Sequence, residues 1–367
     1  MEKKLGFGCM RLPMNGEEVD YEEFNKMIDY FMEQGFNYFD TAHGYINGKS
    51  ETAIRDCLSA RYPRERFILT NKLTGPYFKT QEDIRPFFES QLKLTGVEYF
   101  DYYLMHAQDK DNYPHFQECK AYEVAQELKK EGKIKHVGIS FHDSAEFLDK
   151  ILTDHPEIEI VQIQFNYIDY HSASVQSRLC YEVCRKHGKE LLIMEPVKGG
   201  GLVNLPEDAK KIFDSINEGK NLSYASYAIR FAAGFDGVFK VLSGMSNLEQ
   251  MKDNVSYMKD FEPLNDEEKG AVAKVTNILA GLGGIPCTGC RYCVEGCPMG
   301  IKIPDLFSCY NAKKQFNDWN SKMYYEKTVH DSGKASECIK CGQCASVCPQ
   351  HLQIPDLLED VAKEFEN

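Results

Sequence analysis

The sequence predicts an α/β protein in which a parallel (β/α)8 TIM barrel is followed by a small, mainly α-helical module. Two observations indicate this architecture. In the first part of the chain, short β-branched runs alternate with amphipathic helical patterns eight times. Beyond it, eight of the fourteen cysteines fall in two runs of identical spacing. We expect a barrel at 1–262, a connecting helix and linker at 263–284, and the cysteine module at 285–367.

The eight expected strands are short runs rich in apolar, β-branched and aromatic residues. They lie at 5–10, 38–42, 67–72, 102–106, 136–141, 160–166, 191–196 and 238–243. The clearest amphipathic helices between them are expected at 21–34, 50–61, 81–95, 116–131 and 173–187. A doubly wound dinucleotide-binding fold would require G-x-G-x-x-G after the first strand, and the segment 6–11, GFGCMR, does not supply it.

Composition narrows the class of protein. The 367 residues are 43% hydrophobic, which is ample for a core, and no apolar run approaches the roughly 20 residues that span a bilayer. The N-terminus lacks the apolar stretch of a signal peptide, so we expect a cytoplasmic protein without membrane attachment. The net charge of −13, without a basic cluster, argues against a nucleic-acid partner.

The cysteine runs have the form C-x2-C-x2-C-x3-C-P, which is typical of paired 4Fe-4S clusters. Three cysteines spaced by two residues wrap one cubane, while the fourth reaches across to the other. The first cluster is therefore expected on Cys287, Cys290, Cys293 and Cys348, and the second on Cys338, Cys341, Cys344 and Cys297. Zinc is the weaker alternative, because four-cysteine zinc sites need neither the third cysteine of each run nor the proline.

Four ionisable residues follow the ends of consecutive expected strands. Asp40 and Tyr45 come at and after the end of the second strand, Lys72 ends the third and His106 ends the fourth. In a parallel barrel the carboxyl ends of the strands form one mouth, where active sites lie. Each residue alone is more often structural, but four of them at one mouth indicate a catalytic site.

These residues carry a family resemblance. The segments FDTAHGYINGKSE, ILTNKL and DYYLMHAQD are similar to the Asp, Tyr, Lys and His signatures of the aldo-keto reductases. The chain as a whole resembles the iron-sulfur branch of that family. This implies reduction of a small-molecule carbonyl by NADP(H) or NAD(H). Tyr45 would act as acid/base, with Lys72 lowering its pKa and Asp40 holding the Lys72 ammonium in place, and His106 would orient the substrate oxygen.

The resemblance also implies cofactor contacts. Ser140 and Gln162 match positions that bind the nicotinamide carboxamide, and Met194 stands where many relatives place an aromatic ring. Phe141 follows Ser140 where the family often has asparagine. The full expected set is Cys9, Met10, Ser140, Phe141, Gln162, Met194, Pro196, Val197, Lys198, Gly244, Ser246, Gln250, Asp253 and Asn254.

Two parts of that set are expected to bind the pyrophosphate and the adenosine end of the cofactor. Backbone amides around 197–199 are candidates for the pyrophosphate. Ser246, Gln250, Asp253 and Asn254 match the adenosine-binding segment of the potassium-channel β-subunit branch. The Lys-Ser and Arg pattern for a 2′-phosphate is absent, so both NADP and NAD remain open.

The role of the clusters has three interpretations. They relay electrons to a redox partner such as ferredoxin or flavodoxin, serve a substrate that takes single electrons, or act as structural staples. An alternative for the whole chain is an electron-transfer or redox-sensing protein whose barrel binds nucleotide but reduces carbonyls only slowly.

Overall fold

The computed structural model describes residues 3–366 except 283, 288 and 349. The chain forms two compact units. The first, here called the barrel unit, comprises Met1–Asn166, Leu179–Pro196 and Ala225–Leu264. The second, the cysteine unit, comprises Tyr167–Arg178, Val197–Tyr224 and Asn265–Asn367.

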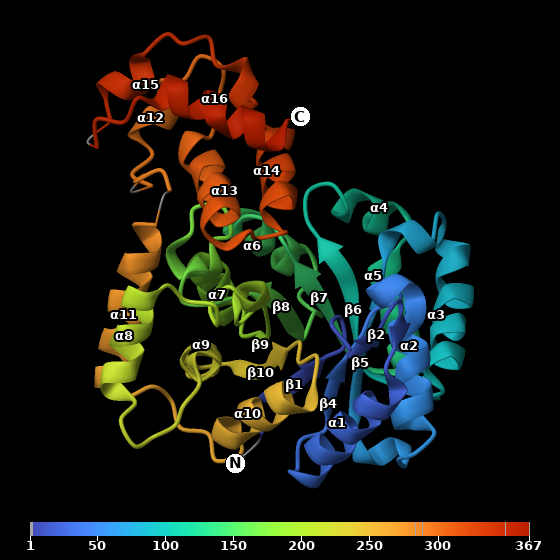
Figure 1. The fold of residues 1–367 in the computed structure, drawn as a ribbon. Coiled ribbons are helices and arrows are strands. Elements are labelled where there is room, and N and C mark those ends of the chain that lie inside the picture. Colours follow the sequence, from blue (N-terminus) through green and yellow to red (C-terminus); the bar gives the residue numbers. More distant parts are fainter. Residues whose placement is uncertain (1–2, 283, 288, 349, 367) are drawn as a thin grey trace. The chain divides into compact units, whose positions relative to one another are not determined.

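Eight parallel strands close the barrel in the order β1-β10-β9-β8-β7-β6-β5-β4 (Figure 1), as the alternating pattern predicted. Each strand lies within a few residues of its expected position. The strands are β1 Leu5–Gly8, β4 Tyr38–Asp40, β5 Ile68–Leu73, β6 Phe100–Gln108, β7 Ile134–Phe141, β8 Ile160–Gln164, β9 Glu190–Met194 and β10 Val238–Ser243. A short hairpin, β2 Met14–Asn15 with β3 Glu18–Val19, lies between β1 and the first helix.

The helices of the barrel unit follow the amphipathic segments of the sequence. Helix α1 begins after Asp20, whose carboxylate accepts a hydrogen bond from the Glu23 amide, and it buries Phe24, Ile28 and Phe31. The others are α2 Lys49–Ile54, α3 Gln81–Thr95, α4 Tyr113–Glu118, α5 Ala121–Lys130, α6 Ala145–Asp154, α7 Ser177–Lys186, α9 Tyr224–Ala233 and α10 Leu248–Met258, with α1 at Tyr21–Glu33.

Two expected helices are interrupted. The segment 50–61 is α-helical only to Ile54 and continues as a π-helical turn at Arg55–Ser59. The segment 116–131 is split into α4 and α5, because Lys120 adopts a left-handed conformation with φ of 50°. Hydrophobic periodicity continued through both breaks, so the pattern could not reveal them.

Side chains pack the interior of the barrel. Tyr38, Tyr102 and Ile160 belong to one buried cluster with residues of the neighbouring strands. The packing leaves no room for a side chain at Gly138, because a Cβ atom there would lie 2.5 Å from the carbonyl oxygen of Ile160. The interior of the barrel is therefore filled by packed side chains.

The cysteine unit is mainly helical, as predicted. Its helix α11, Asp266–Ala280, starts with a capping box between Asn265 and Glu268. The other helices are α8 Glu207–Ile216, α12 Tyr292–Glu295, α13 Ile303–Phe316, α14 Ser321–His330, α15 Gln343–Ser346 and α16 Ile354–Phe365. Helices α8 and α11 lie side by side (Figure 1), so a segment that follows β9 packs on the helix that precedes the cysteine motifs.

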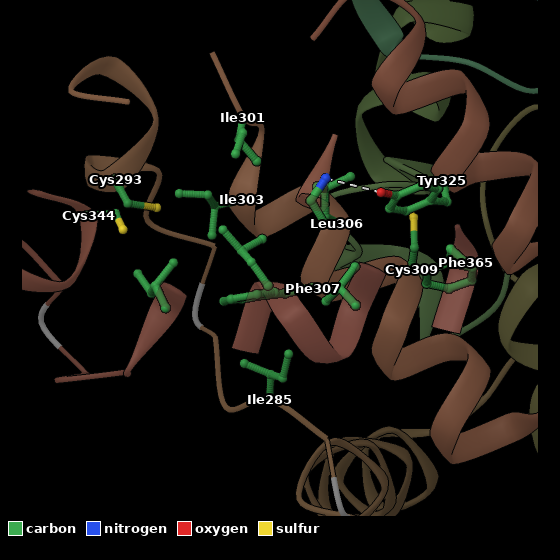
Figure 2. Close-up of a cluster of buried hydrophobic side chains, with 14 of the residues drawn as sticks. Ile285, Cys293, Ile301, Ile303, Leu306, Phe307, Cys309, Tyr325, Cys344 and Phe365 are labelled. Carbon is green, nitrogen blue, oxygen red and sulfur yellow. Dashed lines mark hydrogen bonds between the residues drawn. The ribbon is translucent and has the colours of Figure 1, made fainter. Parts of the chain in front are cut away.

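The core of the cysteine unit includes some of the cysteines themselves. Figure 2 shows Cys293 and Cys344 at one end of a buried cluster, and Tyr325 and Phe365 stacked at the other end. The Tyr325 hydroxyl accepts a hydrogen bond from the Ala335 amide at 3.2 Å.

Among the described residues, no helix is both long enough and apolar enough to cross a membrane.

Candidate active site

The four expected catalytic residues all belong to the barrel unit. Asp40 is the last residue of β4, Lys72 lies in β5, and His106 lies near the end of β6. Tyr45 begins a 3-10 turn five residues after Asp40. Since β4, β5 and β6 are adjacent parallel strands, their carboxyl ends bring these side chains together.

Lys72 is the centre of the site. Its side chain is 0% exposed, and its Nζ donates hydrogen bonds to Asp40 Oδ1 at 2.6 Å and to the Thr41 carbonyl at 2.9 Å. Burial lowers the pKa of Lys72, but the charges of Asp40 and Tyr45 outweigh it and raise the pKa above the ordinary value. Burial raises the pKa of Asp40 against the opposing effect of Lys72. Lys72 therefore remains a protonated, fixed cation.

Tyr45 lies beside this cation. The Lys72 Nζ is 4.8 Å from the centre of the phenol ring. Burial raises the pKa of Tyr45, while the charge of Lys72 lowers it; the net direction is upward. Lys72 therefore acts on the phenol pKa in the expected direction, while desolvation of the buried phenol has the larger effect.

His106 faces Tyr45 with its ring centre 6.1 Å from that of the phenol. Its Nδ1 lies 2.8 Å from the hydroxyl oxygen of Thr74. Burial, together with the charge of Lys72, holds the pKa of His106 well below its usual range, so the imidazole is neutral near pH 7. When the Thr74 hydroxyl donates to Nδ1, the proton sits on Nε2, which can then donate to a substrate oxygen.

A buried polar network supports β5 from behind. The side chain of Asn71 accepts a hydrogen bond from the Lys72 amide at 2.8 Å and donates one to Glu51 at 2.7 Å. Gln91 donates to Glu51, to Asn71 and to the Lys72 carbonyl. The other carboxylate oxygen of Glu51 lies 2.6 Å from His43 Nδ1. This network, which the sequence did not single out, holds the backbone that carries Lys72.

The expected nicotinamide contacts lie on three neighbouring strands. Ser140 and Phe141 end β7, Gln162 lies in β8, and Met194 ends β9. The Ser140 hydroxyl oxygen accepts a hydrogen bond from the Ala107 amide at 2.7 Å, and the Gln162 side chain lowers the pKa of Asp40. On the other side of the mouth, Cys9 is buried after β1, and Met10 is 38% exposed.

The segment after β10 is held by its own polar side chains. The Ser246 amide donates to the Gln250 side chain at 2.8 Å, and Asn254 accepts a hydrogen bond from the Ser243 hydroxyl at 2.7 Å. Asp253 lies 3.4 Å from the Asn254 side-chain nitrogen. Gly244 precedes this group directly after β10.

Arg11 is a basic residue at this segment that the sequence did not single out. Its backbone carbonyl accepts a hydrogen bond from the Ser246 hydroxyl at 2.9 Å. Its guanidinium lies near Gly244 and forms a 3.2 Å ion pair with Glu195. The sequence did not reveal this contact, because Arg11 is far from Ser246 along the chain.

Pro196 is the last barrel-unit residue before a break, and Val197 and Lys198 belong to the cysteine unit. Lys198 is buried, with its Nζ donating to Asp169 at 2.8 Å and to Asp318 at 2.7 Å. The sequence had suggested only backbone amides here. Since Asp169 and Asp318 come from remote parts of the chain, no local pattern could have predicted this buried ion triad.

The eight motif cysteines gather in the two sets that their spacing suggested. Cys287, Cys290, Cys293 and Cys348 line one small cavity. Cys297, Cys338, Cys341 and Cys344 line a second. Pro349, the proline of the second motif, lies outside the described residues. Four thiols around an enclosed space match the donor set of a cubane, whose iron and sulfide fill the volume between the thiolates.

Comparison with known proteins finds a matching family model for each of two parts of the chain. The model of the aldo/keto reductase family matches residues 4–277, and that of a 4Fe-4S dicluster domain matches residues 286–352. An NADH-specific methylglyoxal reductase from Escherichia coli is 24% identical over 264 residues, which cover 60% of this chain and 78% of the relative. Dihydrodiol dehydrogenase 3 from Bos taurus is 26% identical and covers 76% and 91% of the two chains.

Solved structures agree with the barrel. The holo form of an aldo-keto reductase from Bacillus halodurans superposes with a TM-score of 0.60 and 25% identity, covering 74% of this chain and 91% of that one. An aldo-keto reductase from Klebsiella pneumoniae in complex with NADPH gives a TM-score of 0.61 at 18% identity, with coverage of 75% and 95%. The second likeness is one of fold alone.

Proposed function

Because the chain belongs to the aldo/keto reductase family, we propose that its barrel unit reduces a small-molecule carbonyl to an alcohol, with hydride from NADPH or NADH. The observation that carries this proposal is the buried Lys72–Asp40 pair beside Tyr45 and opposite a neutral His106. A cytoplasmic location accompanies the proposal, since none of the cysteines that the structure describes forms a disulfide.

Each residue has one part in the reaction. A bound nicotinamide would supply the hydride. Tyr45 donates the proton to the carbonyl oxygen, and the fixed charge of Lys72 limits how far burial raises the phenol pKa. Asp40 keeps Lys72 in place. His106 donates a hydrogen bond from Nε2 to the same oxygen and stabilises the negative charge that develops there.

The nicotinamide would be held by Ser140, Gln162 and Met194, and the adenosine end by the segment that contains Ser246. We propose that Arg11 favours NADPH, because it puts a cation beside that segment. Ser246 can also offer its hydroxyl to a phosphate.

For the cysteine unit we propose two 4Fe-4S clusters on the two cavity-lining cysteine sets. The clusters would both complete the fold and carry electrons. Cys290 and Cys341, one from each set, are exposed, so each cluster would have an edge near the surface. A ferredoxin or flavodoxin could exchange electrons there.

The decisive experiment replaces Tyr45 with phenylalanine. We expect kcat for aldehyde reduction to fall by about 10²–10⁴-fold, the usual value of a general acid. Methylglyoxal, the substrate named for the Escherichia coli relative, is the first aldehyde to test. Tyr21→Phe, at an exposed tyrosine of α1, is the matched control and should leave the rate unchanged. Undiminished turnover in Tyr45→Phe with intact cluster absorbance would remove Tyr45 from the role of acid.

The exposed Cys290 and Cys341 also favour the second candidate, an electron-transfer protein with a nucleotide-binding barrel. The candidates are separated by adding NADPH anaerobically without substrate and recording the EPR signal of reduced clusters. A signal without aldehyde turnover would favour electron transfer. Turnover without a signal would favour a reductase that works independently of its clusters.

A further inference from the structure

The cysteine unit contains a cavity that the proposed carbonyl site does not use. Its volume is about 540 Å³, within the range of small-molecule sites, and all of its lining residues belong to the cysteine unit. The walls come from the segment after β8, the start of the segment after β9, helices α11 and α13, the first cysteine motif, and Gln350, which follows the second motif.

One wall is shared with the first cysteine-lined cavity. Cys287, Pro304 and Gln350 line both spaces. The chain just before Cys287 is fixed, because the Asn311 side chain accepts a hydrogen bond from the Ile285 amide at 2.7 Å and donates one to the Ile285 carbonyl at 2.8 Å. Cys287, a proposed cluster ligand, is therefore part of the wall of the large cavity.

A second wall holds a buried charge. The Lys198 side chain is 1% exposed and gives two of its three N–H groups to Asp169 and Asp318. Its third N–H has no hydrogen-bond partner among the residues that the structure describes. Both hydrogen-bond acceptors of Lys198 are carboxylates, and a cluster on four thiolates would itself be an anion beside the same cavity. Anions such as phosphates are therefore disfavoured here.

The remaining walls are neutral. Ala280, Ala312 and Phe316 give apolar surface, while Ser308 and Gln315 are uncharged polar groups. Besides Lys198 and Asp169, the ionisable side chains on the described lining are His171 and the proposed cluster ligand Cys287. These walls suit an uncharged organic molecule with a hydrogen-bond acceptor for Lys198.

We propose that this cavity binds an uncharged quinone-type molecule, with one carbonyl oxygen directed at Lys198 and its ring near Cys287. Three observations define this class. The two carboxylates beside Lys198 and the nearby cluster site disfavour anions, the third N–H of Lys198 lacks an acceptor among the described residues, and the wall shared with a cluster ligand favours a redox-active molecule. The lining residues all belong to the cysteine unit, so quinone binding can be tested independently of carbonyl reduction in the barrel unit.

The test uses the full-length protein with both clusters and duroquinone, whose methylated ring offers no free position for thiol addition. Calorimetry should detect saturable binding to the wild type. Ala280→Phe should weaken it at least tenfold by filling the cavity. Ala273→Phe, at an exposed alanine on the same helix that does not line the cavity, should leave it unchanged. Ala312→Leu, from α13, provides a second filling variant.

Two further readouts locate and define the ligand. Duroquinone should change the visible circular dichroism of the clusters, because Cys287 lies in both walls. Anthraquinone-2-sulfonate, an anionic quinone, should bind more weakly than duroquinone. The proposal is overturned by no binding to the wild type, by equal binding to all variants, by an unchanged cluster spectrum, or by stronger binding of the sulfonate.

Discussion

The two units hold their reactive groups in opposite ways. In the barrel unit, Lys72 and His106 are positioned by protein hydrogen bonds to Asp40 and Thr74, above a separately packed interior. In the cysteine unit, Cys293 and Cys344 are members of the hydrophobic core itself. The barrel site is thus preorganised without its cofactor, whereas the core of the cysteine unit is completed by what its thiols bind.

The largest effect should come from breaking the core of the cysteine unit. We expect Cys293→Ser to lose the first cluster, which lowers the iron content from about eight to about four atoms per chain. The unit should also become sensitive to proteolysis, because cluster binding contributes folding free energy. Cys309→Ser is the matched control: Cys309 is buried in the same core but lies in neither motif, so iron should be retained. Full iron content in Cys293→Ser would refute the assignment.

In the barrel unit, the corresponding break is Lys72→Met. Removing the cation leaves the buried Asp40 carboxylate unpaired, which costs about 3–5 kcal/mol when a buried pair is broken. Thermal unfolding and turnover should both fall, while iron content stays constant. The double variant Asp40→Asn/Lys72→Met should recover much of the stability but none of the activity. Recovery of activity in the double variant would show that the pair serves only the fold.

A smaller effect tests whether the guanidinium of Arg11 contributes to nucleotide binding by the barrel unit. Arg11→Ala should raise the Kd for NADPH about tenfold, the scale of one exposed charge-assisted hydrogen bond, and leave the Kd for NADH nearly unchanged. Fluorescence titration of the nucleotides measures both. Arg55→Ala, at an exposed arginine paired with Asp56, serves as a charge-matched control. Equal losses for NADPH and NADH would place Arg11 away from a 2′-phosphate.

The smallest effect concerns pH. The pKa of His106 is lowered in the folded barrel, so below its ordinary value of 6.5 the unfolded chain binds a proton that the folded chain does not. Stability should therefore decrease as the pH falls below about 6.5. The variant His106→Gln should show a shallower loss of Tm between about pH 7 and pH 5 than the wild type. Identical slopes would show that His106 protonates normally in the folded protein.

The sequence predicted most of the barrel because its signals are local. Each strand is a short run that a single window detects, and Asp40, Lys72 and His106 come at the ends of such runs. The identical spacing of the cysteine runs likewise suggested which thiols share a cavity. Breaks such as Lys120 were missed, because the apolar period continues through them.

Other features depended on distant parts of the chain. Burial decides the pKa of Tyr45, and burial is set by the whole barrel mouth. Arg11 meets Ser246, and Lys198 meets Asp318, only after folding. No local pattern marks such pairs, which is why the buried triad and the cavity that Lys198 lines were not predicted.

The segments after β8 and β9 are part of the cysteine unit, although they are encoded within the barrel sequence. For protein engineering, this means that the two units are not interchangeable cassettes. A chain cut after Leu264 would strip α8 of its partner α11 and Lys198 of its partner Asp318. A transplant of the cysteine module onto another barrel would need to carry both segments, as three separate pieces of sequence that form one folding unit.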